Sequence, residues 1–481
     1  MSDRALWTLE AMAAAMRASR AGSLPATVRG LSIDSRSIEP GEAFFAILGE
    51  NRDGHEFVGA ALERGAALAV VSKEKRGAMP PDAPLLVVPD VLAALRDLAG
   101  AARARSRARI VAVTGSVGKT GTKDALRVAL ARQGETHASA ASYNNHWGVP
   151  LSLARLPQAA RFAVFEIGMN HAGEIAPLTR LVRPHVAIVT AVEPVHLEFF
   201  DSVEAIADAK AEIFLGLEPD GAAVVNRDSA LYERLVRAAQ AAGATRIVAF
   251  GEHEKSDARL VKLSLRPDGS SVRADVLGHK MVYKLGAPGR HLALNSLAVL
   301  AAAALVGADL AIAVLALAAL EPPSGRGRRI ALETPNGAAL LIDESYNANP
   351  ASMRAALALL GQAAVSGRGR RIAVLGDMLE LGQSAAEFHR QLVEPIVSND
   401  IDLVFCAGAL MRSLWDELPP ERRGGYAETS AALKADVLAT IRGGDVVMVK
   451  GSLGSRMGSI VKALVRRFPR QEAAAPAAAQ G

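Results

Sequence analysis

The sequence predicts an α/β protein built from three domains. Its 481 residues are too many for a single hydrophobic core. Strand-like and helix-like runs alternate through much of the chain, which is typical of parallel sheets covered by helices. The composition changes at a basic run, 103–109, and again at a turn-rich run, 321–329. We therefore expect a small α/β domain at 1–107, a central, mostly parallel sheet at 108–322 and a Rossmann-like domain at 323–470, followed by a disordered tail at 471–481.

The composition favours small anionic ligands over nucleic acid. Half of the residues are apolar and only 4% are aromatic, so Ala, Val, Leu and Ile must form most of the core. The formal charge is +5 and the pI is about 9.4, which suits anionic partners. The scarcity of aromatic residues and the lack of a zinc-finger or RNA-binding signature argue against nucleic acid as the partner.

Several features indicate the cytoplasm. The single cysteine, Cys406, excludes a disulfide framework, and the N-terminus lacks the apolar segment of a signal peptide. The very apolar stretch 292–320 is interrupted by Gly307 and Asp309, which predicts two buried helices rather than a membrane span. We expect a monomer that does not insert stably into membranes.

Two polar clusters stand out in the N-terminal domain, between strand-like runs at 43–48, 67–71 and 85–88. One lies at 34–36 and the other at 51–55. They have two interpretations, which both stay open. The clusters belong to ordinary loops, or they present hydrogen-bond donors to a diphosphate or a sugar through Ser35, Arg36, Asn51, Arg52 and His55.

A phosphate-binding turn opens the central domain. An apolar run ends in Thr114-Gly-Ser-Val-Gly-Lys-Thr120, and a helix-forming segment follows. The two glycines let backbone N–H groups converge on a phosphate, and the helix N-terminus adds positive potential. In such loops the lysine, Lys119, reaches the terminal phosphates and the hydroxyl of Thr120 binds Mg²⁺. Val113 stands where the usual motif has its first glycine, so a plain glycine turn stays an alternative.

Polar residues follow the next two predicted strands, 162–168 and 186–190. Ligands of open α/β sheets bind at the carboxyl ends of the strands. Glu166 and His196 are therefore predicted to lie on the same edge of the sheet as Lys119.

The helix that follows carries a lysine on its apolar face. It has a capping signal at Asp201 and Glu204, and Lys210 lies four residues from both Ile206 and Phe214. Such a lysine either extends its ammonium group to solvent or loses its charge by desolvation. In the second case the neutral amine can react with CO₂ and give a carbamate, which is an anionic metal ligand.

The third domain repeats the alternation of strands and helices. Strands are predicted at 371–375, 403–406 and 445–450, and polar loops follow at 376–382 and 450–452.

These motifs, taken in order from about residue 30 to 460, resemble the Mur ligase family. The quoted residues are Asp34-Ser-Arg36 with Asp53-Gly-His55, Thr114 to Thr120, Asn144-Asn-His-Trp-Gly-Val-Pro150, Glu166, His196, Lys210, Gly289-Arg-His291 with Asn295, Ser345-Tyr-Asn-Ala-Asn-Pro350, Gly376-Asp-Met-Leu-Glu-Leu-Gly382 and Lys450-Gly-Ser452. The short phosphate loop is the form typical of this family, which explains Val113.

The resemblance implies roles for individual residues. The ATPase-type central domain would bind ATP through Thr114, Gly115, Ser116, Val117, Gly118, Lys119, Thr120, Gly121, Asn145 and Asn295, with Arg326 and Glu344 from the third domain. The catalytic set would be Lys119, Glu166, His196 and Lys210, with Mg²⁺ on Thr120, Glu166 and a carbamylated Lys210. The N-terminal domain would hold a UDP-sugar, and further substrate contacts would come from Tyr346, Asn347, Asn349 and Lys450.

Two positions depart from the family pattern. Val117 stands where Asn or Ser is usual, with little expected effect because the loop binds through its backbone. Asp343 and Glu344 stand where two aspartates are usual, and which of these acids faces the ligands stays open.

Within the family, the motifs are most similar to those of the ligase that joins D-alanyl-D-alanine to UDP-N-acetylmuramoyl-tripeptide through an acyl phosphate. A sister ligase that adds the third residue carries an Asp-Asn-Pro-Arg motif, which this chain lacks. Folylpolyglutamate synthase is not expected to have the domain with Asp34-Ser-Arg36. A P-loop kinase or nucleotide switch requires neither an inward Lys210 nor two additional ligand-binding domains. Whether the third residue of the tripeptide is diaminopimelate or L-lysine stays open.

Overall fold

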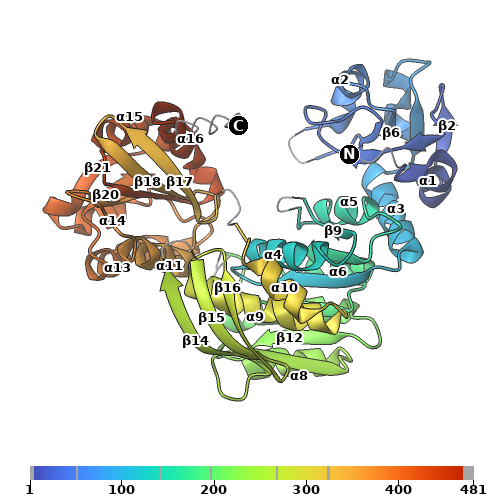
Figure 1. The fold of residues 1–481 in the computed structure, drawn as a ribbon. Helices are drawn as coiled ribbons and strands as arrows, with labels where there is room; N and C mark the ends of the chain where they lie inside the picture. The colour runs from blue at the N-terminus through green and yellow to red at the C-terminus, as the bar shows by residue number, and fades with distance from the viewer. Residues whose placement is uncertain are drawn as a thin grey trace, which may run out of the picture.

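Three large β-sheets are found in the described residues, and each comes from its own segment of the chain (Figure 1). The computed structural model describes residues 5–49, 52–140, 143–194, 198–266, 269–321 and 325–469. A small additional sheet pairs β1 (Trp7–Thr8) with β3 (Thr27–Val28). The predicted α/β class is confirmed. The tail predicted at 471–481 lies outside the described residues.

The N-terminal sheet is covered by helices on both faces. In spatial order its strands are β2 (Ser19–Ala21), β7 (Leu85–Val88), β6 (Leu68–Ser72), β5 (Glu42–Phe45) and β4 (Gly30–Ser32), and all neighbours except β2 and β7 are parallel. The helices are α1 (Leu9–Met16), α2 (Val58–Glu63) and α3 (Val91–Arg105). Alternate residues of a strand face opposite layers, so Phe45 packs with α1 and α3 whereas Phe44 packs with α2. The three strands predicted here are confirmed, although β5 ends three residues early.

The central sheet is parallel over most of its width and antiparallel at one end. Its spatial order is β16 (His279–Leu285), β15 (Gly269–Val276), β14 (Ala258–Arg266), β13 (Arg246–Gly251), β12 (Ala222–Asn226), β11 (Val186–Val189), β8 (Arg109–Thr114), β10 (Phe162–Glu166) and β9 (Thr136–Ala138). The antiparallel pairs are β14 with β15 and β15 with β16. The alternation of strands and helices predicted the parallel part. The antiparallel part is an addition that the prediction did not contain.

Helices cover both faces of the central sheet. One face carries α4 (Lys119–Ala131), α9 (Arg290–Leu305) and α10 (Leu310–Leu317), and the other carries α5 (Gly148–Ala154), α6 (Ile175–Val182), α7 (Val203–Ala211) and α8 (Tyr232–Ala241). The two helices predicted within 292–320 are confirmed, with Asp309 as the N-cap of α10. None of the helices in the described ranges has the length and apolarity that crossing a bilayer requires. The cap of α7 is Ser202, not Asp201, because the Ser202 hydroxyl accepts the Ala205 N–H.

The C-terminal sheet has the order β17 (Arg328–Thr334), β18 (Gly337–Glu344), β22 (Val446–Lys450), β19 (Arg371–Gly376), β20 (Leu403–Ala407) and β21 (Arg423–Ala427), and only β17 runs antiparallel to its neighbour. The predicted strands are confirmed as β19, β20 and β22. One face carries α11 (Pro350–Gly361), α12 (Ala385–Arg390), α13 (Val393–Ser398) and α14 (Arg412–Glu417), and the other carries α15 (Ser430–Thr440) and α16 (Gly458–Arg467).

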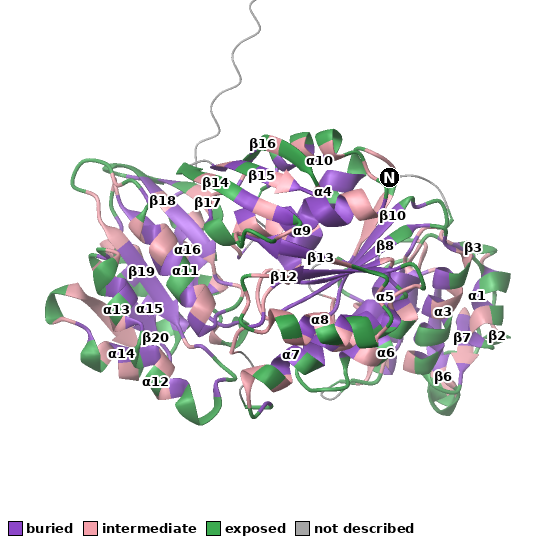
Figure 2. Ribbon diagram, turned by 90° about the horizontal axis from the view of Figure 1, so that it is seen from below, coloured by how far each residue is buried: buried purple, intermediate pink, exposed green. Residues whose placement is uncertain are grey.

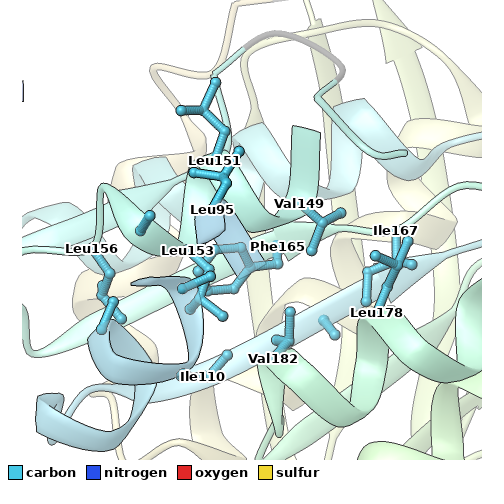
Figure 3. Packing of buried hydrophobic residues seen from close by; sticks show 14 of the residues in the cluster. Leu95, Ile110, Val149, Leu151, Leu153, Leu156, Phe165, Ile167, Leu178 and Val182 are labelled. Carbon is cyan, nitrogen blue, oxygen red and sulfur yellow. The ribbon is translucent and has the colours of Figure 1, made fainter. Parts of the chain in front are cut away.

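The apolar core on one face of the central sheet continues into the N-terminal segment. Leu95 of α3 lies beside Leu151 and Leu153 of α5, and all three are fully buried (Figure 3). The buried clusters of the C-terminal sheet contain only residues of 330–468. Figure 2 shows that buried residues run along the strands and that exposed residues lie on the outer faces of the helices. The domain boundaries at 107/108 and 322/323 stay predictions.

Candidate functional site

The phosphate loop connects β8 to α4 at the carboxyl edge of the central sheet. Gly115 and Gly118 have φ angles of +149° and +86°. Residues other than glycine rarely adopt such angles, because their Cβ clashes with the backbone. A Cβ on Gly115 would overlap the Thr190 hydroxyl, and a Cβ on Gly118 would lie 2.5 Å from the Asn295 amide nitrogen. Both glycines are therefore required by their surroundings. Asn295, expected near the nucleotide, does lie against this loop.

Hydrogen bonds with the segment that follows β11, a neighbour of β8 in the sheet, hold the loop in shape. The Thr190 hydroxyl donates to the Val117 carbonyl over 2.6 Å, and the Ser116 hydroxyl donates to the Glu193 carbonyl over 3.0 Å. The Lys119 ammonium donates to the Gly115 carbonyl over 2.6 Å. Burial lowers the pKa of Lys119, whereas the carboxylate of Glu166 acts in the opposite direction. The Lys119 ammonium thus lies over the loop, where a bound phosphate would replace the Gly115 carbonyl as its hydrogen-bond acceptor.

Glu166 is the centre of the site. It ends β10, directly beside Val113 of β8 in the parallel register, and it is 1% exposed. Its two carboxylate oxygens accept hydrogen bonds from the Thr120 hydroxyl over 2.8 Å and from the Asn144 amide over 2.7 Å. The prediction that Glu166 and Lys119 share one edge of the sheet is confirmed. A buried carboxylate beside a threonine hydroxyl is a donor set that suits Mg²⁺.

Lys210 points inward from α7. It is 2% exposed, and burial together with the nearby charge of Lys119 places its pKa well below the usual value. Extension of the ammonium group into solvent, the first of the two interpretations of this lysine, does not fit this burial. A neutral amine is the form that reacts with CO₂.

The start of the C-terminal segment faces the same site. The Arg326 guanidinium lies 4.3 Å from the centre of the Tyr346 ring, and its charge contributes to lowering the pKa of Lys119 after the larger effect of burial. The Lys450 ammonium pairs with Glu344 over 3.2 Å and donates to the Asn347 carbonyl over 3.0 Å.

The two neighbouring acids of β18 have different surroundings. Asp343 is buried and accepts from the Gly325 N–H and from the hydroxyl of Ser345, so the turn itself uses its oxygens. Glu344 is on the side of Lys450. Of the two acids, Glu344 is the more exposed, and its contact with a ligand stays a prediction.

A cleft of about 1250 Å³ connects the N-terminal segment to this edge. Its lining includes Ser35, Arg36 and Arg52 from the N-terminal side and continues past Trp147 to Gly168, two residues beyond Glu166. The Arg36 guanidinium donates two hydrogen bonds to Asp34, over 2.9 and 2.7 Å, and holds the pKa of that carboxyl at about 2. The cleft thus has arginines at one end, and at the other it reaches Asn145 and Gly168, which lie near the carboxyl edge of β10.

Comparisons with known proteins agree with this geometry. Residues 27–103 match the model "Mur ligase family, catalytic domain", 113–303 match "Mur ligase middle domain" and 325–453 match "Mur ligase, glutamate ligase domain". The UDP-N-acetylmuramoyl-tripeptide–D-alanyl-D-alanine ligases of Bacillus subtilis and Escherichia coli are each 33% identical to the chain, over 91% of it and over 93% and 94% of their own lengths. The chain belongs to the Mur ligase family.

Solved structures of Mur ligases share the fold. MurF from Acinetobacter baumannii has a TM-score of 0.81 at 29% identity, covering 96% of this chain and 99% of its own. MurF from Thermotoga maritima, solved in complex with ADP, has a TM-score of 0.74 at 25% identity, covering 92% and 98%.

Some residues predicted for the Mur ligase site have contacts of a different kind. His55 is 7% exposed, its Nε2 accepts the Ser72 N–H and its Nδ1 bonds to Asp53, so it holds its own loop and does not line the cleft. Asn349 caps α11 through the Ser352 N–H. The contacts of these two residues are those of residues that stabilise the protein's own loop and helix, rather than those of ligand-binding residues. Asn51 and His196 lie outside the described residues.

Asn144 and Asn145 of this Mur ligase make different contacts. Asn144, which the sequence placed only near the site, contacts Glu166, whereas Asn145 accepts the Gly148 N–H at the start of α5 and lines the cleft. A nucleotide contact for Asn145 stays a prediction. Only the motif Asn144-Asn145 signalled this contact, and it does not tell which amide turns inward.

Proposed function

We propose that this Mur ligase is an ATP-dependent enzyme of peptidoglycan precursor synthesis that joins D-alanyl-D-alanine to UDP-N-acetylmuramoyl-tripeptide. The observation that carries the proposal is the cleft that runs from Arg36 and Arg52 to the edge beside Glu166. A UDP-sugar held at the cationic end would extend its peptide toward the phosphate loop. The relatives named for this reaction match the chain over nearly its whole length. We further propose that the enzyme acts as a monomer in the cytoplasm.

The reaction activates a carboxylate before it forms a peptide bond. The terminal carboxylate of the tripeptide attacks the γ-phosphorus of ATP, a new P–O bond forms, and the bond to the β,γ-bridging oxygen breaks to release ADP. The amine of D-alanyl-D-alanine then attacks the acyl carbon, loses a proton, and expels phosphate. A protein nucleophile is not needed, because the acyl phosphate is itself the reactive donor.

The residues at the sheet edge have matching tasks. The Lys119 ammonium, which now donates to a loop carbonyl, would donate to the terminal phosphates, and the loop N–H groups would hold them in line. Asn144 and the Thr120 hydroxyl fix the orientation of the Glu166 carboxylate. From the C-terminal segment, Arg326 and Glu344 would contact ATP, and Lys450, which pairs with Glu344, would face the incoming dipeptide.

The donor set fits Mg²⁺, with Thr120, Glu166 and a carbamate on Lys210 as its protein ligands. When bound, Mg²⁺ would neutralise charge on the transferred phosphate. The carbamate would form when the neutral amine of Lys210 attacks CO₂ and releases one proton. Its negative charge would lie near the Lys119 ammonium, so the repulsion between two lysines would become an attraction.

The assignment is tested by phosphate release from ATP with substrates added singly and together. We expect turnover only when UDP-N-acetylmuramoyl-tripeptide and D-alanyl-D-alanine are both present, and none with Lys119→Ala. Equal turnover with a free amino acid in place of the dipeptide would overturn the assignment. Running the panel with diaminopimelate and with L-lysine at the third position identifies the tripeptide.

The carbamate has a separate test. Lys210→Ala should lose activity that short carboxylic acids partly restore, because they can supply the missing anionic ligand. Full activity of Lys210→Ala without any added acid would refute the carbamate and leave the ligase assignment standing.

A further inference from the structure

At the antiparallel end of the central sheet, no helix of the described residues covers one of the two faces. Strands β14, β15 and β16 pack their other face against α9 and α10, where Val272, Tyr283 and Leu285 are buried. In Figure 1 these strands form the edge of the central sheet farthest from the N-terminal sheet. Their second face is the basic sheet face, which we define by Arg259, Lys262, Arg266, Arg273, Lys280 and Lys284.

The register of the strands places these cations together. Lys262 lies directly opposite Arg273, which lies opposite Val282. In the neighbouring row Arg259 and Lys280 lie on either side of Asp275. Residues opposite one another on antiparallel strands share a face, and like charges in such positions repel. The row of Lys262 and Arg273 therefore costs stability in the free protein. An anionic partner would relieve this repulsion between like charges.

The face is poorly neutralised by the protein itself. Lys284 has an interaction partner of its own. Within the described part of the chain, none of the other five cations, Arg259, Lys262, Arg266, Arg273 and Lys280, takes part in an ion pair. Residues 258–285 contain six Lys or Arg against two Asp, so this short segment supplies four of the five excess positive charges of the chain. Among the described residues of this face the one acid is Asp275, which accepts the Gly278 N–H of the adjacent turn.

Apolar side chains stand between the cations. Val282 is 65% exposed and Val261 is 49% exposed, both in strands that carry the charges. The only aromatic residue of the three strands, Tyr283, is buried on the opposite face and bonds to Ser296 over 2.6 Å. Nucleic-acid surfaces that grip single strands use exposed aromatic rings, which this face lacks. Cations with interspersed aliphatic side chains match a lipid surface with anionic headgroups above an apolar interior.

We propose that the basic sheet face docks the protein reversibly on an anionic phospholipid bilayer, with Val261 and Val282 entering the headgroup region. The contact is peripheral and leaves the phosphate loop unchanged. Each cation near an anionic surface strengthens binding by about fivefold, and screening by salt weakens it.

The test is co-sedimentation of the full chain with vesicles of phosphatidylcholine, alone or with about one-third phosphatidylglycerol. We expect binding only to the anionic vesicles, lost at about 0.5 M NaCl. The variant Lys262→Glu/Arg273→Glu/Lys280→Glu should bind at least about 100-fold more weakly. The matched control Lys73→Glu/Lys434→Glu/Lys462→Glu changes the net charge equally at exposed positions elsewhere and should keep most of the binding.

Both triple variants should retain phosphate release in solution, which shows that they are folded. Equal loss of binding in the two variants would mean that net charge alone is responsible, and it would overturn the proposal. Unchanged binding of the first variant would overturn it too, as would binding to a single-stranded oligonucleotide without binding to the anionic vesicles.

Discussion

The N-terminal and C-terminal segments are attached to the central sheet in different ways. The N-terminal segment shares a core with it, because α3 contributes Leu95, Leu98 and Ala102 to the cluster that contains α5 and α6. Arg103 strengthens this joint, since its guanidinium donates to the Val182 carbonyl over 2.8 Å and pairs with Glu218 over 2.6 Å. The buried apolar clusters of the C-terminal segment contain no residue of the other two segments.

The contacts between the central and C-terminal segments act instead through charge. Burial is the largest cause of the pKa shifts of Lys119, Glu193 and His291, and charges of the C-terminal segment modify them. Arg326 lowers the pKa of Lys119, Arg354 lowers that of Glu193, and Glu344 raises and Lys450 lowers that of His291. Such interactions change gradually with distance, whereas a packed apolar core tolerates little displacement. We infer that the N-terminal and central segments move as one body and that closure over the substrates is a movement of the C-terminal segment. Closure would protect the acyl phosphate from water.

The largest expected effect comes from separating the segments. Residues 325–481 expressed alone should fold cooperatively, because they contain complete cores. Residues 1–107 alone should not, because the buried face of α3 would be exposed to water. Thermal unfolding followed by circular dichroism measures both, and a cooperative transition for 1–107 would contradict the shared core.

A substitution at the catalytic edge should leave this architecture intact. Glu166→Gln removes the charge but keeps the size, and we expect a loss of at least about 100-fold in kcat. The melting temperature should change little. Wild-type kcat in this variant would remove Glu166 from the mechanism.

Core substitutions distinguish the two bodies. Leu151→Ala, in the shared core, should destabilise the N-terminal and central segments by about 2–5 kcal/mol and leave the transition of the C-terminal segment in place. Leu357→Ala, in α11, is the matched control and should have the reverse effect. Calorimetry of both variants provides the measurement. A single transition that shifts equally in both would show that the chain unfolds as one unit.

Acid should weaken the larger body through His137. Burial lowers the pKa of this residue from 6.5 to about 4, and its Nε2 contacts the Ser152 carbonyl over 2.8 Å. Because the unfolded chain binds a proton at higher pH than the folded one, this contribution is complete above pH 6.5 and is lost as the pH falls toward 4, by at most about 3 kcal/mol. Urea titrations of His137→Gln between these pH values should show a flatter dependence than the wild type. If the free energy of unfolding depends on pH in the same way in both proteins, His137 is not the cause of the acid destabilisation.

Local patterns in the sequence were sufficient for the catalytic edge. The glycines of 115–118 and the spacing of Lys210 on α7 are signals that a few neighbouring residues determine, so they predicted the glycine loop and placed Lys210 on the apolar face of its helix. The spacing left open whether Lys210 extends to solvent or is buried, and only the fold shows its burial. The sequence was less informative about which of two adjacent polar residues points into the site. Asn144 and Asn145, or Asp343 and Glu344, differ in direction only because of the sheet and turn around them.

Other features depend on tertiary contacts. His55 is a polar residue in a loop, and only the fold shows that Ser72 and Asp53 hold both of its ring nitrogens. The antiparallel strands β14 to β16 escaped prediction in part because an irregularity between Leu260 and Lys262 interrupts the alternation of apolar and polar residues. Their charged face resembles a solvent-exposed loop when it is read along the chain.

The proposed mechanism requires that a peptide carboxylate accepts the γ-phosphoryl group of ATP at the edge formed by Lys119, Thr120 and Glu166. Labelling that carboxylate of UDP-N-acetylmuramoyl-tripeptide with ¹⁸O tests it directly by mass spectrometry of the released phosphate. We predict that each phosphate carries one labelled oxygen, because the bridging oxygen of the acyl phosphate leaves with phosphorus. Phosphate without label, formed alongside the joined peptide, would contradict the account.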